Sequence, residues 1–114
     1  MEFSAQGSPK SVSDQIETFA RAQGNVTALV VPWESSATTL SMAVTAVKSD
    51  GWAIEHTNLG TITLTAAEGA TRVAIVGHDL EHGNKVKLTA LFDQFARDVQ
   101  QRLAAGHGVG DRPQ

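Results

Sequence analysis

Apolar side chains recur at spacings of three and four residues in three segments of the chain, which is the spacing of one helix face. The first segment, residues 11–23, opens with Ser11 or Ser13 as a cap and is followed by Gly24, a common helix terminator. The second, residues 34–51, begins with capping serines and closes at Gly51. The third, about residues 85–105, has the longest apolar stripe: Leu88, Leu91, Phe92, Phe95, Ala96, Val99 and Leu103. Three helices are predicted, the last about 30 Å long.

Four other segments are rich in β-branched and apolar residues and favour strands: 25–33, 52–57, 61–66 and 71–77. Residues 61–66 alternate between threonine and apolar side chains, which is typical of a strand with one buried face. Residues 25–33 are apolar on both faces, so we expect both sides of that strand to be covered. The linkers between the last three segments have hairpin length, which indicates an antiparallel meander.

The element order α-β-α-β-β-β-α predicts one α+β domain over residues 11–105. Its two layers would be a four-stranded, mostly antiparallel sheet and the long C-terminal helix packed across it. Residues 1–10 and 106–114 are polar or glycine-rich, and we expect a flexible arm and a flexible tail there.

Charge and composition exclude several classes of function. The 12 acidic and 9 basic residues give a net charge of −3, and the basic residues are scattered. Nucleic-acid binders need a basic face that neutralises phosphates, so we expect no nucleic-acid partner. The chain has no cysteine, which excludes disulfides and thiolate metal sites. No apolar leader or membrane-length apolar run is found, which predicts a cytoplasmic protein without a membrane span.

The order of elements, with a long amphipathic helix after a meander, resembles that of the helix-grip group, which includes START-type lipid-binding domains and small domains of outer-membrane assembly lipoproteins. The resemblance covers residues 25–105. It rests on "TTLSMAVTAVKSDGWAIEHT", read as helix, Gly-Trp turn and strand, and on the final helix "TALFDQFARDVQQRL". It implies binding rather than catalysis and assigns no site residue. Four strands leave little room for a lipid-sized cavity.

The stretch "GHDLEH" is the first candidate for chemistry, because it places four polar groups, His78, Asp79, Glu81 and His82, within five positions and reads as the H-x-x-E-H signature of inverted zinc proteases. It lies between two glycines, which leaves too little length for the helix that such ligands need. In a strand, His78 and His82 would be about 13 Å apart, too far for one ion. A turn could bring the two together as a weak metal site. Our interpretation is a solvated strand end, with no cofactor.

Two other groups of residues are candidate binding surfaces. Trp33, Trp52 and His56 lie at strand ends or on an apolar strand face, where they either belong to the core or line a ligand crevice. Thr61, Thr63 and Thr65 form an uncharged outward face that could be covered by the first helix, stay wet, or pair with a second copy.

The sequence therefore favours a non-enzymatic binding or interaction module, whose partner is a second copy in a homodimer, another protein or a small apolar ligand. A small hydrolase or isomerase remains an alternative, with His56 or His78 acting with Asp79 or Glu81. A partner-binding protein of the inhibitor or immunity type is the third hypothesis, in keeping with a small acidic domain.

Overall fold

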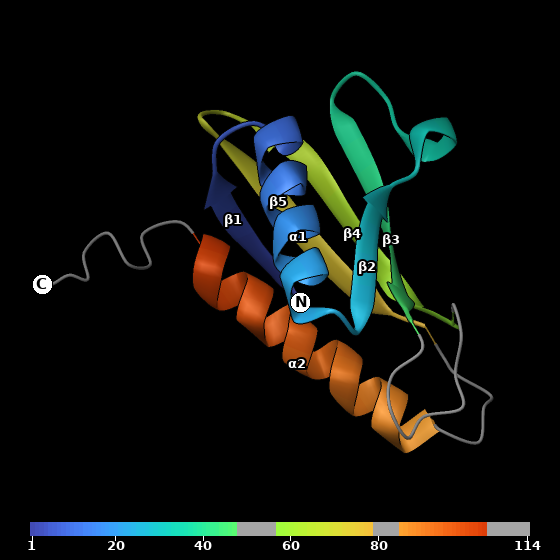
Figure 1. The fold of residues 1–114 in the computed structure, drawn as a ribbon. Coiled ribbons are helices and arrows are strands. Elements are labelled where there is room, and N and C mark those ends of the chain that lie inside the picture. Colours follow the sequence, from blue (N-terminus) through green and yellow to red (C-terminus); the bar gives the residue numbers. More distant parts are fainter. Residues whose placement is uncertain (48–56, 79–84, 105–114) are drawn as a thin grey trace, which may run out of the picture.

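The computed structural model describes residues 1–47, 57–78 and 85–104, which form an antiparallel sheet of five strands with two long helices on one of its faces (Figure 1). The elements are β1 (Glu2–Gln6), α1 (Pro9–Gln23), β2 (Val26–Val30), the short 3-10 helix η1 (Pro32–Glu34), β3 (Thr39–Ala46), β4 (Thr57–Ala67), β5 (Ala70–Gly77) and α2 (Lys85–Leu103). The strand order is β1-β5-β4-β3-β2, so the first strand of the chain pairs with the last.

The predicted α+β class, the first helix, the two strands at 61–66 and 71–77 and the long C-terminal helix are confirmed. The predicted strand at 25–33 is shorter, because Pro32 begins η1. Most of the predicted strand at 52–57 and the expected tail at 106–114 lie outside the described residues.

The predicted helix over residues 34–51 is wrong, because residues 39–46 form strand β3. Leu40 and Val44 are four residues apart, a spacing that satisfies both a helix face and alternate positions of a strand. The buried side chain of Met42, midway between them, fits only the strand. β3 pairs with β2 on one side and β4 on the other, and this pairing outweighs the local pattern. The helix on which part of the helix-grip resemblance rested is therefore absent at residues 39–46.

The expectation of a flexible arm over residues 1–10 is also wrong at Glu2–Gln6, which form β1 and raise the number of strands from four to five within the described residues. β1 pairs with β5 over its whole length. Ala5 is buried, and Phe3 packs on the core beside it. The hydroxyl of Thr71, fully buried on β5, donates a hydrogen bond to the carbonyl of Gly7 (2.7 Å) and fixes the end of β1.

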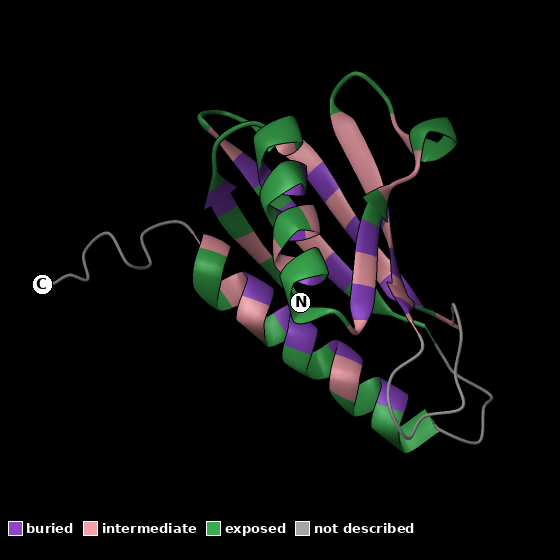
Figure 2. Cartoon of the chain, in the orientation of Figure 1, coloured by how far each residue is buried: buried purple, intermediate pink, exposed green. Residues whose placement is uncertain are grey.

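The core lies in one layer, between the sheet and the two helices (Figure 2). α1 packs on β2, β3 and β4, and α2 packs on β1, β4 and β5. The largest fully buried side chains come from both layers: Phe95, Ile16, Met42, Leu59, Ile62, Leu64, Leu88, Val12, Val26, Val44 and Val73. Both helices therefore pack on the same face of the sheet.

A β-bulge near the N-terminal end of β4 turns one extra side chain into this core. The register between β3 and β4 shifts so that Val44 pairs with Gly60 and Thr45 with Asn58, which leaves Leu59 without a partner residue. Leu59 and Gly60 are consecutive and both buried. The side chain of Asn58 accepts a hydrogen bond from the backbone N–H of Gly60 (3.1 Å), which holds the local bend.

Helix α1 begins with Ser8 as its N-cap, rather than with the predicted Ser11 or Ser13. The Ser8 hydroxyl accepts from the backbone N–H of Ser11 (3.2 Å), and Pro9 occupies the first turn. We expect Ser8→Ala to lower the free energy of unfolding by about 1 kcal/mol, because that N–H loses its partner. Chemical denaturation measures the change. Ser11→Ala is the control, since alanine within the first turn leaves stability unchanged or slightly raised, and equal losses for both variants would contradict the assignment of the cap.

Candidate functional site

The face of the sheet opposite the helices is not covered by any described residue (Figure 1). Its outward positions carry hydroxyl or small apolar side chains for the most part: Ser4, Thr27, Leu29, Thr39, Ser41, Ala43, Thr45, Thr61, Thr63, Thr65, Ala74 and Val76. These residues, together with Glu2 and Arg72, are called the open face below. Much of it is half-buried by neighbouring side chains, but Leu29 (54 % exposed) and Val76 (61 %) project from it.

The predicted threonine surface is in the centre of the open face. Thr61, Thr63 and Thr65 lie on β4, the middle strand of the sheet, and are half-buried, while Ile62 and Leu64 between them face the core. On either side, Thr63 pairs with Ser41 of β3 and with Ala74 of β5. The first helix does not cover these threonines, because it packs on the other face.

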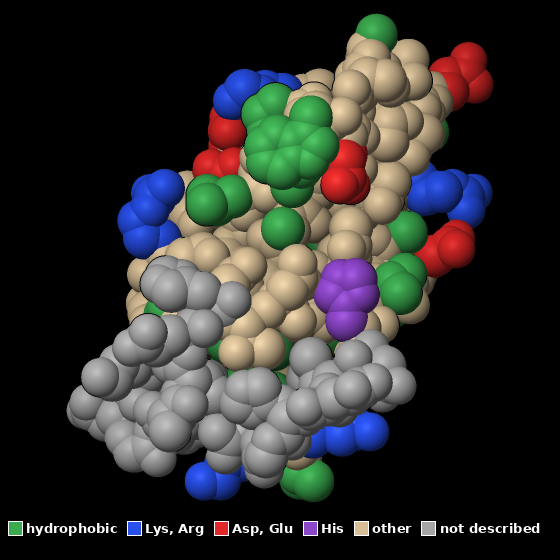
Figure 3. Space-filling view, turned by 90° about the vertical axis from the view of Figure 1, so that its right-hand side faces the viewer, with side chains coloured by type: hydrophobic (Ala, Val, Ile, Leu, Met, Phe, Trp, Pro, Cys, Tyr) green, Lys and Arg blue, Asp and Glu red, His purple; other side chains and the backbone are tan. Residues whose placement is uncertain are grey.

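Charge is nearly absent from this surface. The five strands contain two charged residues, Glu2 and Arg72, and these pair with each other at the β1 side of the sheet (Nη1 to Oε1 3.1 Å). Figure 3 shows a side of the molecule where the backbone and uncharged polar side chains, drawn in tan, cover much of the described surface, and Lys, Arg, Asp and Glu side chains lie mainly near its margins. The central part of the open face therefore attracts neither cations nor anions strongly.

His78 follows directly after β5 and is exposed. Its Nε2 atom lies 3.4 Å from the hydroxyl of Thr61, and its backbone N–H donates to the carbonyl of Leu59 (2.9 Å). In the part of the chain that the structure describes, no cluster of three or more His, Asp or Glu side chains could hold a metal ion. Asp79, Glu81 and His82 lie outside the described residues, so the proposed metal pair is not placed.

Trp33 is on η1, where its side chain is 82 % exposed, so it is neither a core residue nor buried in a crevice. Figure 3 shows hydrophobic side chains gathered on the part of the molecule where η1 projects. Trp52 and His56, predicted to share a crevice with Trp33, lie outside the described residues. Of this predicted group, the structure therefore places Trp33 alone.

A crevice between the sheet and the last helix is present, and the described residues that line it do not include Trp33. It is a hollow of about 420 Å³, lined by Met1, Leu59, Ile75, Gly77, His78, Thr89, Phe92, Asp93, Ala96 and Arg97. Of the residues predicted from the sequence, His78 lies there and Trp33 does not. The ring of Phe92, one of the lining residues, fills the space next to Gly60 and Gly77.

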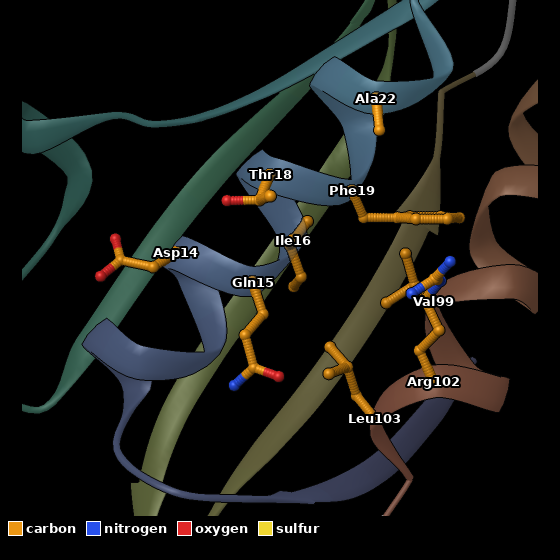
Figure 4. A pocket seen from close by; sticks show the side chains of 9 residues that line it. All are labelled: Asp14, Gln15, Ile16, Thr18, Phe19, Ala22, Val99, Arg102 and Leu103. Atoms are coloured by element: carbon orange, nitrogen blue, oxygen red, sulfur yellow. The ribbon is translucent and has the colours of Figure 1, made fainter.

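A second depression, not predicted from the sequence, separates the two helices on the outer surface of the helix layer. This interhelical groove has a volume of about 510 Å³ and is lined by Asp14, Gln15, Ile16, Thr18, Phe19, Ala22, Val99, Arg102 and Leu103 (Figure 4). Phe19 stacks on Phe95 (ring centroids 5.8 Å apart), and the guanidinium of Arg102 lies 4.2 Å from the centre of the Phe19 ring. The sequence predicted an apolar stripe on each helix. It did not predict that both helices pack on the same face of the sheet.

Two charged side chains are among the residues that line the groove, Asp14 of α1 and Arg102 of α2. Asp14 accepts two hydrogen bonds from Lys10 (2.8 and 3.0 Å), and both this contact and the charge of the carboxylate raise the pKa of the Lys10 ammonium. Arg102 has no hydrogen bond or ion pair with any described residue. Asp98, one helical turn before it, accepts from Gln94 instead (2.9 Å).

Comparison with protein-family models, with curated proteins and with solved structures finds no match to this chain. Neither described helix combines the length and the apolar character that crossing a membrane requires. The geometry of the open face and of the two hollows is therefore the basis for a proposal about function.

Proposed function

We propose that the chain is a non-enzymatic interaction module that forms a homodimer by packing the open faces of two sheets against each other. The observation that carries the proposal is a five-stranded sheet with both described helices on one side. Its other side bears hydroxyl and small apolar groups and a single ion pair. Small apolar groups favour burial, and hydroxyl groups can be buried where they pair with one another, whereas charges at the same positions would oppose burial.

The dimensions of the open face suit a weak or moderate dimer. From the usual strand spacing and rise, the surface over β2 to β5 is about 20 Å wide and about 23 Å long, which gives roughly 450 Å² in flat projection. Two such faces together bury roughly 900 Å², close to the approximately 1,000 Å² at which specific interfaces begin. We therefore expect an equilibrium between monomer and dimer rather than an obligate dimer.

A twofold arrangement suits the residues at the centre of the face. Most soluble homo-oligomers have closed symmetry, in which a residue on the axis meets its own copy. An axis at Thr63 would bring hydroxyl groups opposite hydroxyl groups, and each can both donate and accept a hydrogen bond. The same arrangement would set two like charges against each other if position 63 were charged.

Sedimentation velocity across a range of protein concentrations tests the proposal. We expect the wild-type chain to dimerise and Thr63→Glu to weaken the dimer by about tenfold or more, because two carboxylates would be buried without partners. Thr63→Lys should weaken it similarly. A mixture of the two variants should associate more tightly than either alone, because opposite charges then meet across the axis.

Thr89→Glu is the matched control, since Thr89 is exposed on α2 in the other layer of the molecule. It should leave the dimer unchanged, and circular dichroism should show that all three variants are folded. A monomer at the highest concentration would overturn the proposal. So would a dimer that survives both charges at position 63, which would indicate pairing through the edge of β1 or β2 instead. A different protein bound at fixed stoichiometry to this face would favour the inhibitor-type hypothesis.

One observation favours the enzymatic alternative. His78, which follows β5, lines the hollow together with Asp93 and Arg97 of α2, so an imidazole ring and two charged side chains line the same hollow. If the wild-type chain hydrolyses simple esters, and His78→Ala abolishes that turnover while the fold is retained, a hydrolase would replace the interaction module as the preferred function. The helix-grip resemblance stays a prediction, supported by the position of α2 across the sheet.

A further inference from the structure

We propose that the interhelical groove between α1 and α2 binds a small amphiphilic monocarboxylate, such as a medium-chain fatty acid, with the carboxylate on Arg102. The site is on the opposite layer from the open face and does not depend on dimerisation. Its volume of about 510 Å³ lies within the range of pockets that hold small ligands.

The walls of the groove suit an apolar chain. Ile16 and Phe19 from α1 and Val99 and Leu103 from α2 line it, and Figure 4 shows these side chains pointing into the space between the helices. The same view shows the oxygen atoms of Asp14 and Thr18 pointing to the other side of α1, away from α2. Ile16 and Val99 are 1 % exposed and already packed in the core, so an alkyl chain along the groove would contact mainly Phe19 of α1 and Leu103 of α2. Burial of its methylene groups between these side chains favours binding.

Arg102 is held in place for an anion. Its guanidinium lies over the Phe19 ring, 4.2 Å from the ring centre, so its position is fixed by an aromatic side chain. The N–H donors of a guanidinium lie in one plane, and a carboxylate can accept two of them. No described residue supplies such an acceptor, because Asp98 accepts from Gln94 and Asp14 accepts from Lys10.

The charged side chains of the groove also favour a ligand with one negative group rather than two. Arg102 is the one cation in the lining of the groove, and the carboxylate of Asp14 points away from α2. A second negative charge on the ligand would find no further cation in this lining, and the ammonium of Lys10 is paired with Asp14. A single carboxylate at one end of an apolar chain matches this distribution, whereas a dianion or an acidic peptide does not.

Isothermal titration calorimetry with sodium decanoate tests the inference, and decanol serves as the uncharged probe of the same chain length. We expect saturable one-to-one binding of decanoate that is about tenfold tighter than that of decanol. Arg102→Met retains an unbranched apolar stem without the charge and should weaken decanoate by about tenfold, while decanol binding stays the same. Arg97→Met is the matched control on the same helix, outside the groove, and should change neither affinity.

Chemical shifts of backbone amides place the ligand and complete the test. On addition of decanoate, the amides of Phe19, Val99 and Leu103 should shift most, and those of Thr61, Thr63 and Thr65 should not. Absence of saturable binding would overturn the inference. Equal affinity for decanoate and decanol, an unchanged affinity in Arg102→Met, or shifts centred on the open face would each overturn it as well.

Discussion

Replacement of Phe95 by alanine is expected to lower the free energy of unfolding by about 3–5 kcal/mol, which is the usual range for a buried aromatic ring. Phe95 is 1 % exposed and heads the fully buried side chains by volume. It belongs to α2 and stacks on Phe19 of α1, with an interplanar angle of 17°. Its removal would leave a cavity at the place where both helices and the sheet meet, and the neighbouring backbone is held by three elements and cannot close it.

Urea denaturation followed by circular dichroism measures this loss from the midpoint and the slope of the transition. Val86→Ala is the matched control, because Val86 is on the same helix and 83 % exposed, and its loss should be less than about 0.5 kcal/mol. A loss below about 1.5 kcal/mol for Phe95→Ala would contradict the description of this core. The variant should also bind decanoate more weakly, since Phe19, which supports Arg102, loses the ring beneath it.

The elements that the sequence predicted well are those in which a single periodicity describes the whole segment. In α2 the apolar stripe extends over five turns, and Leu88, Phe92, Phe95 and Val99 are buried as the spacing requires. In β4 the alternation of threonine and apolar residues has only one strand register that buries Ile62 and Leu64. For such segments the local pattern and the tertiary contacts demand the same conformation.

The wrong predictions arose where pairing with distant residues decides the conformation. β1 consists of five residues with little local preference for a strand, and β5, almost seventy residues later in the chain, supplies its hydrogen bonds. β3 contains apolar residues at a spacing that a helix also satisfies, and its two neighbours in the sheet settle the choice. Neither partner is visible in a short window of sequence.

The same distinction between local pattern and distant contacts applies to the candidate sites. The threonine face was predicted because alternation within β4 is local, and the structure extends it with residues of β2, β3 and β5. The interhelical groove was missed because it depends on both helices packing on one face, and on the position of Arg102 over Phe19. In the sequence, an arginine near the end of an amphipathic helix is expected to be a solvent-exposed surface residue. Only the contact with Phe19, which the structure shows, marks Arg102 as a candidate for ligand binding.

The arrangement of the two layers links the two proposals. Since both described helices occupy one face of the sheet, the opposite face remains open to a partner, while the space between the helices remains open to a small ligand. The two surfaces share no side chain, so charge at Thr63 and loss of charge at Arg102 should act independently. Variants at more than about 10 Å with no common partner usually show additive effects.

Replacement of Gly60 by alanine is expected to cost about 3 kcal/mol, because the β-bulge leaves no room for a side chain at this position. A Cβ atom on Gly60 would lie 2.5 Å from the carbonyl oxygen of Val76 and 2.5 Å from the Cζ atom of Phe92. Both distances are far inside van der Waals contact, and the first is to backbone, which cannot rotate away. The bulge also turns Leu59 into the core, so relief of the clash would disturb a buried residue.

Gly77→Ala is the control for this prediction, since its Cβ would meet only the edge of the Phe92 ring, at 3.2 Å, and a small tilt of that ring relieves the contact. We expect a loss of about 1 kcal/mol or less there, measured by the same denaturation experiment. Adding Phe92→Leu to each variant separates the two causes. It should recover most of the loss in Gly77→Ala but little of that in Gly60→Ala, because the contact with the Val76 carbonyl remains. Full recovery in both would mean that the ring, and not the backbone of the bulge, requires glycine at position 60.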